Sequence, residues 1–544
     1  MSIWKRKPLA LLLDEASDTE KGLKKTLTAS GLTALGVGAI IGAGLFSITG
    51  MAAATNAGPA ITISFIVAAI GCVFAGLCYA EFSSMIPVAG SAYTYSFATM
   101  GEFVAWIIGW DLVLEYAVGA ATVSISWSRY LGKFLGGYGI HIDDAFMLSP
   151  FEGGIINVPA VLIVMVMSLV LIRGTKESAF VNGIIVMLKV TVVLVFIALG
   201  WQYIRPENYT PYIPVNKGEF GEFGFSGIIR AAAIVFFAYI GFDAVSTAAQ
   251  EAKNPKRDMP IGILLSLGIC TVLYILFAHV MTGVVNYTAF AGADGIAPVA
   301  IAIDNMGVAD ASGMITPAYP WLNKAIILAI LGGYASVILV MLMGQSRVFF
   351  SMSKDGLMPK VFSEVHPKFR TPAKNNLLFM LIVSLFAAFV PARVVGEMTS
   401  IGTLFAFILV CLGVLVMRKK MPEAPRAFRT PLVPLVPILG IMVCLFMMVF
   451  LPLDTWIRLI VWMMIGFDLY LFYGMKNSML NKGTFDNNSY KVVSLSGIGM
   501  VVILIIVAII HHADTTIDDS FLYYFSLIFS AVHALIYLMS YKKN

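Results

Sequence analysis

The sequence from Gly36 to Phe46 reads GVGAIIGAGLF and lies inside an apolar run at residues 30–54. Its four glycines occupy every second position on the two sides of one Ile-Ile pair. Each glycine costs a helix about 1 kcal/mol relative to alanine, and open backbone is tolerated in a membrane only where it faces protein or a water-filled cavity. The stretch therefore predicts a membrane-spanning helix that is interrupted near its middle. The alternative is close helix packing, for which a pattern such as Gly38-x-x-x-Gly42 is common.

A second interruption is predicted about 200 residues further along the chain. Residues 236–243 read FFAYIGFD, with a glycine in mid-span and the carboxylate of Asp243 two residues later. A charged aspartate costs about 3 kcal/mol in a span on insertion scales. The spans with these two stretches open two blocks of five spans, at 30–204 and 226–417. An odd number of spans per block makes the second block enter the membrane from the opposite side, which is the layout of an inverted-repeat secondary transporter.

The composition is that of a membrane protein. Of 544 residues, 59% are hydrophobic and 12% are charged, whereas soluble proteins carry about 25% charged residues. A soluble multidomain enzyme, a disordered chain and a nucleic-acid binder are excluded on this ground. The five cysteines lie in apolar runs and show no metal-ligand spacing, so we expect no metal site.

Fourteen runs are long and apolar enough to span a bilayer, since one span needs about 20 mostly apolar residues. The loops test this number, because Lys and Arg favour the cytoplasmic side. With the N-terminus inside, 27 of the 36 Lys and Arg residues fall on the cytoplasmic side, 8 on the outer side and one, Lys189, inside a span. We therefore predict an all-α polytopic protein of the plasma (inner) membrane with both termini in the cytoplasm. The predicted spans are 30–54, 59–85, 92–131, 156–173, 178–204, 226–250, 260–286, 323–346, 375–391, 396–417, 433–452, 456–475, 493–512 and 519–540.

The predicted organisation has five parts. The third run is too long for one span, so we expect it to start as a short interfacial segment. No role is assigned to the last four spans beyond scaffold or partner contact, and a small membrane-protein partner on these peripheral helices is left open. Membrane lipid is expected around the spans. The parts are the cytoplasmic segment 1–29, the first repeat 30–204, the second repeat 226–417, the accessory spans 433–540 and the tail 541–544.

A broken helix offers groups that an intact helix conceals. The N-terminus of a half-helix has free N–H groups and a positive dipole end, which bind a carboxylate. The C-terminus of a half-helix has free carbonyls and a negative end, which bind an ammonium group or a cation. Two breaks that meet at the membrane midplane suit one ligand with both charges, and a zwitterionic amino acid is the simplest ligand of this kind.

Several motifs resemble the amino acid–polyamine–organocation superfamily. They are the glycine-rich first span, PVAGSAY at 87–93, FAYIGFD at 237–243, EAKNP at 251–255 and the loop 347–359. Within it, Leu114-Glu115-Tyr116, IGTL at 401–404 and the fourteen spans resemble the cationic amino acid transporter branch. The resemblance covers about residues 20–430. It implies a five-plus-five inverted repeat of the LeuT-like kind and alternating access.

The resemblance also implies a substrate site at the two breaks. Backbone N–H groups near Gly42, Ala43 and Gly44 would hold the substrate carboxylate. Its ammonium group would lie on the carbonyls of Ile40, Phe237, Ala238 and Ile240, and Phe237 would also cover the site as a gate. Similar proteins often have a threonine where this chain has Ala43, so one hydroxyl contact is lost while the backbone donors are kept.

Lys189 lies in the middle of the fifth span, too deep to reach water comfortably. In the family the matching lysine resembles a built-in cation, in the place where sodium-coupled relatives bind Na⁺. Because a buried amine favours its neutral form, we hypothesise that Lys189 takes up and releases the transported proton. The proton would then be the coupling ion, and no cofactor is expected. The alternative is a permanently protonated lysine that pairs with a carboxylate for structure.

Three carboxylates in the spans are further candidates. Glu115 and Asp111 are four residues apart and share one face of the third span. The resemblance places Glu115 near the cavity, where it contacts the substrate, a water network or the proton path, whereas Asp111 suits a solvated layer. Asp243 follows the second break directly, and its alternative role is to satisfy the unwound backbone. Glu115 and Asp243 together suit an Arg or Lys substrate, but also a carrier of neutral amino acids.

These observations predict a secondary active transporter of L-amino acids that works as a proton-coupled symporter by alternating access. The alternative is an exchanger of amino acids or polyamines without proton coupling. An enzyme is not expected, since the spans offer no clustered nucleophile, acid–base pair or metal set. A channel is disfavoured because discontinuous helices that hold a ligand at the midplane are typical of carriers.

Overall fold

The computed structural model describes twelve segments of the chain. Ala89 of the motif at 87–93, Glu251 of the motif at 251–255, Asn544 of the tail 541–544 and most of the segment 1–29 lie outside them. The described residues are 2–9, 11–12, 27–88, 90–173, 178–216, 218–249, 252–291, 298–309, 315–369, 371–482, 485–513 and 520–543.

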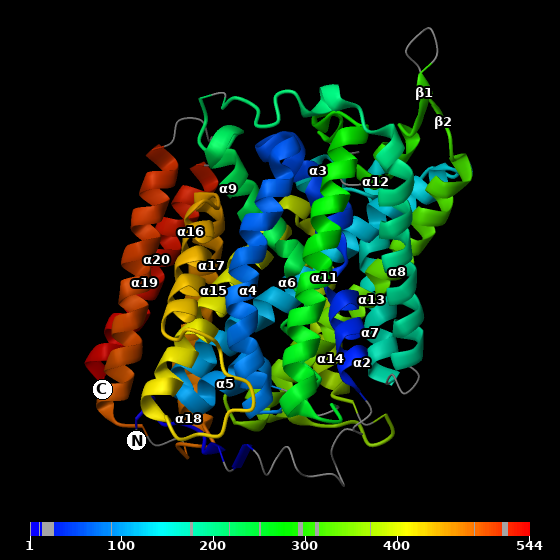
Figure 1. Ribbon diagram of the computed structural model, residues 1–544. Helices are drawn as coiled ribbons and strands as arrows, with labels where there is room; N and C mark the ends of the chain where they lie inside the picture. The colour runs from blue at the N-terminus through cyan, green and yellow to red at the C-terminus, as the bar shows by residue number, and fades with distance from the viewer. Residues whose placement is uncertain are drawn as a thin grey trace.

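The described helices stand side by side in a bundle (Figure 1). In the first predicted repeat they are α2 (Ala29–Ile40), α3 (Thr49–Ala52), α4 (Ile61–Met85), α5 (Ser91–Thr99), α6 (Glu102–Gly136), α7 (Val158–Arg173) and α8 (Ser178–Gly200). In the second they are α9 (Gly224–Val235), α10 (Ala244–Thr247), α11 (Pro255–Val284), α12 (Pro298–Asp304), α13 (Pro320–Lys354), α14 (Ala373–Phe389) and α15 (Ala392–Lys420). The accessory helices are α16 (Leu435–Val449), α17 (Leu453–Leu469), α18 (Met475–Asn477), α19 (Asn487–Ala513) and α20 (Ser520–Lys543).

Ten helical stretches of the described residues are long and apolar enough to cross a membrane. The first of them, Ala29–Met85, contains the first two predicted spans, and α7, α14 and α16 are shorter apolar helices. The chain is therefore a helical, polytopic membrane protein. The number of fourteen spans, the division into repeats and the LeuT-like arrangement stay predictions.

The third predicted span is divided into two helices, as its length suggested. The helix α5 ends at Thr99, and α6 begins at Glu102. Gly101 between them has φ +108°, and a Cβ at this position would lie 2.7 Å from the backbone of Trp4. A side chain is excluded here both by the backbone conformation and by the N-terminal segment that packs against the turn.

A small antiparallel ribbon corrects the all-α prediction in one detail. Strands β1 (Gly307–Ala309) and β2 (Ile315–Pro317) pair at the end of the bundle opposite the termini (Figure 1). Gly307 permits this pairing, because a Cβ there would lie 1.9 Å from the carbonyl oxygen of Thr316. The spans were predicted from long apolar runs, and strands of three residues in a loop do not form such a run.

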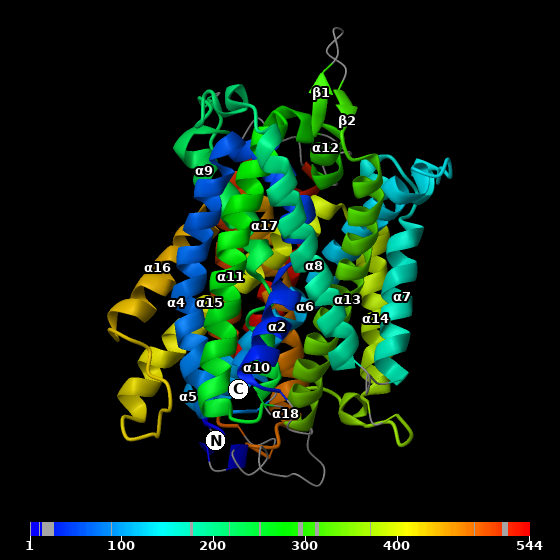
Figure 2. The same cartoon turned by 45° about the vertical axis from the view of Figure 1, so that its right-hand side comes forward.

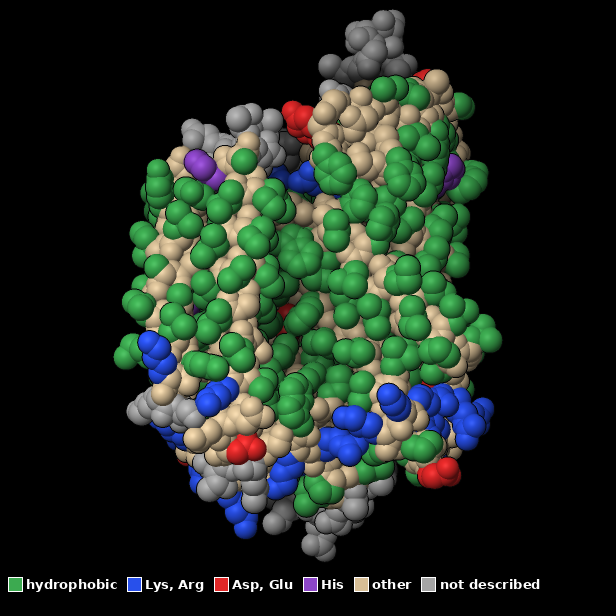
Figure 3. Space-filling model, turned by 90° about the vertical axis from the view of Figure 1, so that its left-hand side faces the viewer, with side chains coloured by type: hydrophobic (Ala, Val, Ile, Leu, Met, Phe, Trp, Pro, Cys, Tyr) green, Lys and Arg blue, Asp and Glu red, His purple; other side chains and the backbone are tan. Residues whose placement is uncertain are grey.

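The two ends of the bundle differ in charge. The N- and C-termini lie at the same end (Figure 1). On the face shown in Figure 3, Lys and Arg side chains gather at that end, below a wide hydrophobic band. We call the end with the termini the basic end and the opposite one the far end.

Burial separates central helices from peripheral ones. Within the most apolar part of each stretch, 94% of the residues of Gly224–Thr247 and 89% of those of α6 are buried inside the protein, against 22% for α20. The helices α2 and α10 lie side by side in the half of the bundle that is nearer the basic end (Figure 2). The interrupted stretches and α6 therefore form the centre, where a site shielded from lipid is built.

Candidate functional site

The first span is interrupted where the glycine pattern predicts it. The helix α2 ends at Ile40, Ile41 is extended with φ −71° and ψ 104°, and helical backbone resumes with a π-helical turn over Gly44–Ile48. Among the described residues, no acceptor faces the backbone N–H groups of Gly42, Ala43 and Gly44. These three donors point from the positive end of a half-helix, which is the arrangement that binds an anion.

The glycines also serve close packing, which was the alternative. A Cβ on Gly44 would lie 2.2 Å from Cα of Ala238, and one on Gly36 would lie 2.4 Å from Oγ of Ser266. The same run of glycines therefore opens the helix and lets the sixth and seventh predicted spans approach its backbone.

The second interruption lies between a 3₁₀ turn at Phe236–Tyr239 and α10. Gly241 has φ +118°, a conformation that favours glycine, and a Cβ there would lie 2.8 Å from the carbonyl carbon of Ala39. Its N–H donates to Oδ1 of Asp243 at 3.2 Å. The two breaks are thus in direct backbone contact, and Asp243 satisfies part of the unwound turn.

The hydroxyl of Tyr274 on α11 joins the two breaks. It lies 2.8 Å from the carbonyl oxygen of Ile40 and 2.8 Å from that of Ala238, so that it shares its hydrogen between them. The carbonyl of Phe237 accepts the N–H of Ile240 at 3.2 Å. Three of the four predicted ammonium ligands already accept one hydrogen bond, and each keeps a second lone pair. Tyr274 was not among the predicted site residues, because a phenol in an apolar span is the only sign of it in the sequence.

Removal of this hydroxyl should loosen the junction of the breaks. For Tyr274→Phe we expect a loss of about 1 kcal/mol of stability, the net value of a buried hydrogen bond, and a lower uptake rate. Thermal unfolding in detergent and vesicle uptake measure the two effects. The control is Tyr138→Phe, which removes an exposed hydroxyl outside the breaks; equal results for both variants would contradict the structural role of Tyr274.

Lys189 reaches from α8 to the backbone of the first interrupted span. Its Nζ donates to the carbonyl oxygen of Gly38 at 2.8 Å and lies 3.2 Å from Oγ of Ser336 on α13. The side chain is buried, and Gly333 leaves room for it, since a Cβ there would lie 2.7 Å from Cε. Within the described segments no carboxylate lies within 4.0 Å of Nζ. The structural alternative of a lysine–carboxylate pair therefore has no partner among these residues.

The three carboxyl groups of the central helices differ in their contacts. Asp243 accepts the hydroxyl of Tyr116 at a short distance. Asp111 and Glu115 are fully buried, and neither has a hydrogen-bond partner within the described residues. Asp243, Asp111 and Thr403 and the phenols of Tyr79 and Tyr116 lie around Glu115. Because an unpaired charge in such a place is costly, Asp111 and Glu115 need water, a proton or a cationic ligand as partner.

The chain matches known permeases over most of its length. A family model described as amino acid permease matches residues 27–469. The branched-chain amino acid permease BcaP of Bacillus subtilis (strain 168) is 46% identical over 485 residues, which cover 88% of this chain and 99% of that protein. The methylthioribose transporter of the same organism is 42% identical over 483 residues, with 88% of this chain and 100% of that protein covered. A vacuolar cationic amino acid transporter 4 of Arabidopsis thaliana is 35% identical over 408 residues, with 75% and 65% covered.

Proposed function

This chain belongs to the amino acid permease family, and on that premise we propose that it is a secondary active symporter, which moves L-amino acids together with protons by alternating access. Membership of the family makes it a multi-pass membrane transporter and supports amino acid transport. The substrate class, the coupling ion and the membrane belong to the proposal.

One observation carries the substrate proposal. The unpaired N–H groups of Gly42, Ala43 and Gly44 adjoin the carbonyls of the second break, since Gly44 and Ala238 are in contact. Donors and acceptors that adjoin in this way suit a zwitterionic amino acid, with its carboxylate on the half-helix N-terminus. Phe237 is buried beside this junction, and we assign it the role of a gate.

The identity of the substrate is proposed from the relatives and the site together. The relatives at 46% and 42% identity are named for branched-chain amino acids and for methylthioribose. Methylthioribose has neither a carboxylate nor an ammonium group, so it would leave the three N–H groups without an anion. A branched-chain amino acid satisfies them, and we propose this class. A cationic amino acid is the second choice, with its side chain directed to Glu115 and Asp243.

The proton is proposed as coupling ion because of the contacts of Lys189. This amine binds the carbonyl of Gly38 in the first interrupted span and Ser336 on α13. An ammonium group there donates to both acceptors, while a neutral amine binds them more weakly. Loss of the proton therefore loosens the link between α8 and the interrupted span, which couples protonation to a movement of that span.

The orientation of the protein in the membrane is proposed from the Lys and Arg residues at the basic end. Loops rich in Lys and Arg stay on the cytoplasmic side, so we place the basic end and both termini in the cytoplasm and the far end outside. The plasma membrane is the proposed location.

Uptake into proteoliposomes tests the proposal. Labelled leucine, alanine, arginine, lysine and methylthioribose are offered with and without an inward proton gradient. Accumulation of leucine that follows the gradient supports the symporter. Uptake only into vesicles preloaded with an amino acid would instead establish an exchanger, with Lys189 as a fixed charge. Accumulation of methylthioribose alone would refute the amino acid substrate.

A further inference from the structure

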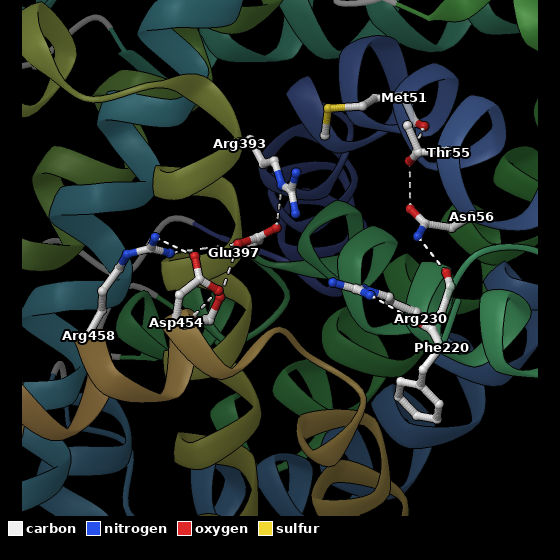
Figure 4. Close-up of polar contacts among 11 residues, drawn as sticks. Met51, Thr55, Asn56, Phe220, Arg230, Arg393, Glu397, Asp454 and Arg458 are labelled. Carbon is white, nitrogen blue, oxygen red and sulfur yellow. Dashed lines mark hydrogen bonds and ion pairs between the residues drawn. The ribbon is translucent and has the colours of Figure 1, made fainter. Parts of the chain in front are cut away.

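Two arginines at the far end present unused hydrogen-bond donors to the same space. Arg230 lies on α9, and Arg393 lies at the start of α15. In Figure 4 both side chains point toward the space in front of the Glu397 carboxylate, and Met51 and Thr55 of the first interrupted span border this space. We call Arg230 and Arg393 the outer arginine pair.

Arg393 uses only one edge of its guanidinium group. Its Nε donates to Oε1 of Glu397 at 2.9 Å, one helical turn further along α15. Its two terminal nitrogens have no acceptor among the residues that the structure describes, and its side chain is 63% exposed, against 4% for Glu397. The part of Arg393 that faces the solvent is therefore free to bind an anion.

Glu397 keeps its place without Arg393. Its other oxygen, Oε2, accepts the hydroxyl of Thr455 at 3.0 Å and lies 3.7 Å from Nη1 of Arg458. Arg458 also pairs with Asp454 at 2.5 Å. Thr455, Arg458 and Asp454 all belong to α17. Glu397 is therefore held by α17 as well as by Arg393.

Arg230 lies opposite and also has donors to spare. Its Nη1 donates to the carbonyl oxygen of Phe220 at 2.9 Å, while Nε and Nη2 find no acceptor in the described part of the chain. The loop that holds it is fixed by Asn56, whose amide donates to the carbonyl of Gly221 at 2.8 Å. The carboxylates of Glu397, Asp454 and Glu222 and the guanidinium group of Arg393 are the charged groups that act on Arg230. Among the described residues, no carboxylate lies within 4.0 Å of the Arg230 guanidinium group, so its spare donors are not used by an ion pair.

We propose that the outer arginine pair is a capture site for the α-carboxylate of the amino acid before it reaches the breaks. This inference rests on the proposed function. A guanidinium group binds a carboxylate with two parallel N–H donors, and the spare donors of Arg230 and Arg393 come from the two sides of the entrance. Oε1 of Glu397, released by Arg393, then faces the ammonium group. The first interrupted span leads from this entrance to the N–H groups at residues 42–44.

The site has a kinetic signature that a structural ion network lacks. A contact between an exposed guanidinium group and the α-carboxylate of leucine weakens as salt rises, because mobile ions screen both charges. Since a hydrogen bond to a charged group contributes about 1.5 kcal/mol or more, Arg393→Gln and Arg230→Gln should raise KM for leucine by roughly tenfold at low ionic strength. The difference from the unaltered protein should shrink at high ionic strength, and Vmax should change little because the breaks are intact.

Initial uptake rates of labelled leucine in proteoliposomes, at low and at high ionic strength, test the proposal. Lys324→Gln is the matched control, since Lys324 lies over the ring of Tyr138 at the same end and is not part of the pair. Arg393→Lys keeps the charge and should recover part of the lost affinity. Thermal unfolding of each variant reports on folding.

The outcomes separate the two proposals. The capture site is overturned if KM is unchanged in both glutamine variants, or if Lys324→Gln raises KM by the same factor. In either case, leucine transport by the unaltered protein still upholds the proposed function. A loss of Vmax with a lower unfolding temperature and the same KM at both ionic strengths shows a structural network instead. Absence of leucine uptake by the unaltered protein overturns both proposals.

Discussion

Replacement of Lys189 by methionine is expected to abolish accumulation driven by a pH gradient. With one proton carried per substrate, one pH unit stores 1.36 kcal/mol and supports about tenfold accumulation. Methionine is close to lysine in length and never carries a proton, so the variant should only equilibrate its substrate. In the unaltered protein uptake should fall as the outer pH rises, because fewer protons are available outside, and in the variant this dependence should vanish. Labelled leucine in proteoliposomes measures both effects.

Lys189→Arg separates a proton carrier from a fixed charge. The guanidinium group of arginine stays protonated in proteins, so it can replace a permanent cation but cannot release a proton. If Lys189 carries the proton, Lys189→Arg loses gradient-driven accumulation, as Lys189→Met does. Full gradient-driven accumulation in Lys189→Arg, with loss only in Lys189→Met, would show that the charge alone is needed. Unchanged pH dependence in both variants would refute any role of Lys189 in coupling.

A methyl group on Gly44 is expected to disable the site. In Gly44→Ala the new Cβ would lie 2.2 Å from Cα of Ala238, so the backbone of one break must move. Overpacking against backbone costs up to about 3 kcal/mol, which is roughly a hundredfold in an equilibrium between conformations. We expect the uptake rate to fall by an order of magnitude or more, measured as labelled leucine taken up per amount of protein in the vesicles.

The matched control is Gly268→Ala on α11. A Cβ at Gly268 meets nothing within 4 Å, and alanine is a better helix former there by about 1 kcal/mol. This variant should transport like the unaltered protein and unfold at the same or a higher temperature. Normal uptake by a folded Gly44→Ala protein would show that the contact between the breaks is not needed for transport.

The breaks in the helices could be predicted from the sequence. The interruption after Ile40, the one before Asp243 and the division of the third predicted span all occur where glycines stand in apolar runs. These features depend on neighbouring residues, since glycine weakens a helix and a span has a fixed length. The ribbon β1–β2 was missed because short strands in a loop follow no apolar period.

The contacts of the site depended on residues far apart in the chain. No local pattern indicates that Tyr274 binds the carbonyls of Ile40 and Ala238, or that Glu115 is left without a partner among the described residues. Such contacts arise when helices that are distant in sequence pack together, and the apolar faces of many helices fit one another equally well. The roles of the predicted site residues in substrate binding and proton transfer stay predictions for the uptake experiments.

The sequence by itself determined that this protein is a polytopic membrane transporter with open backbone at two places, because hydropathy and glycine position act through the nearest residues. Only the tertiary structure decided what that backbone meets: the two breaks touch at Gly44 and Gly241, Lys189 lies on the carbonyl of Gly38, and the outer arginine pair faces Glu397. The physical reason is that a hydrogen bond or an ion pair across the bundle depends on the register and rotation of helices against one another, and these are set by packing over the whole protein.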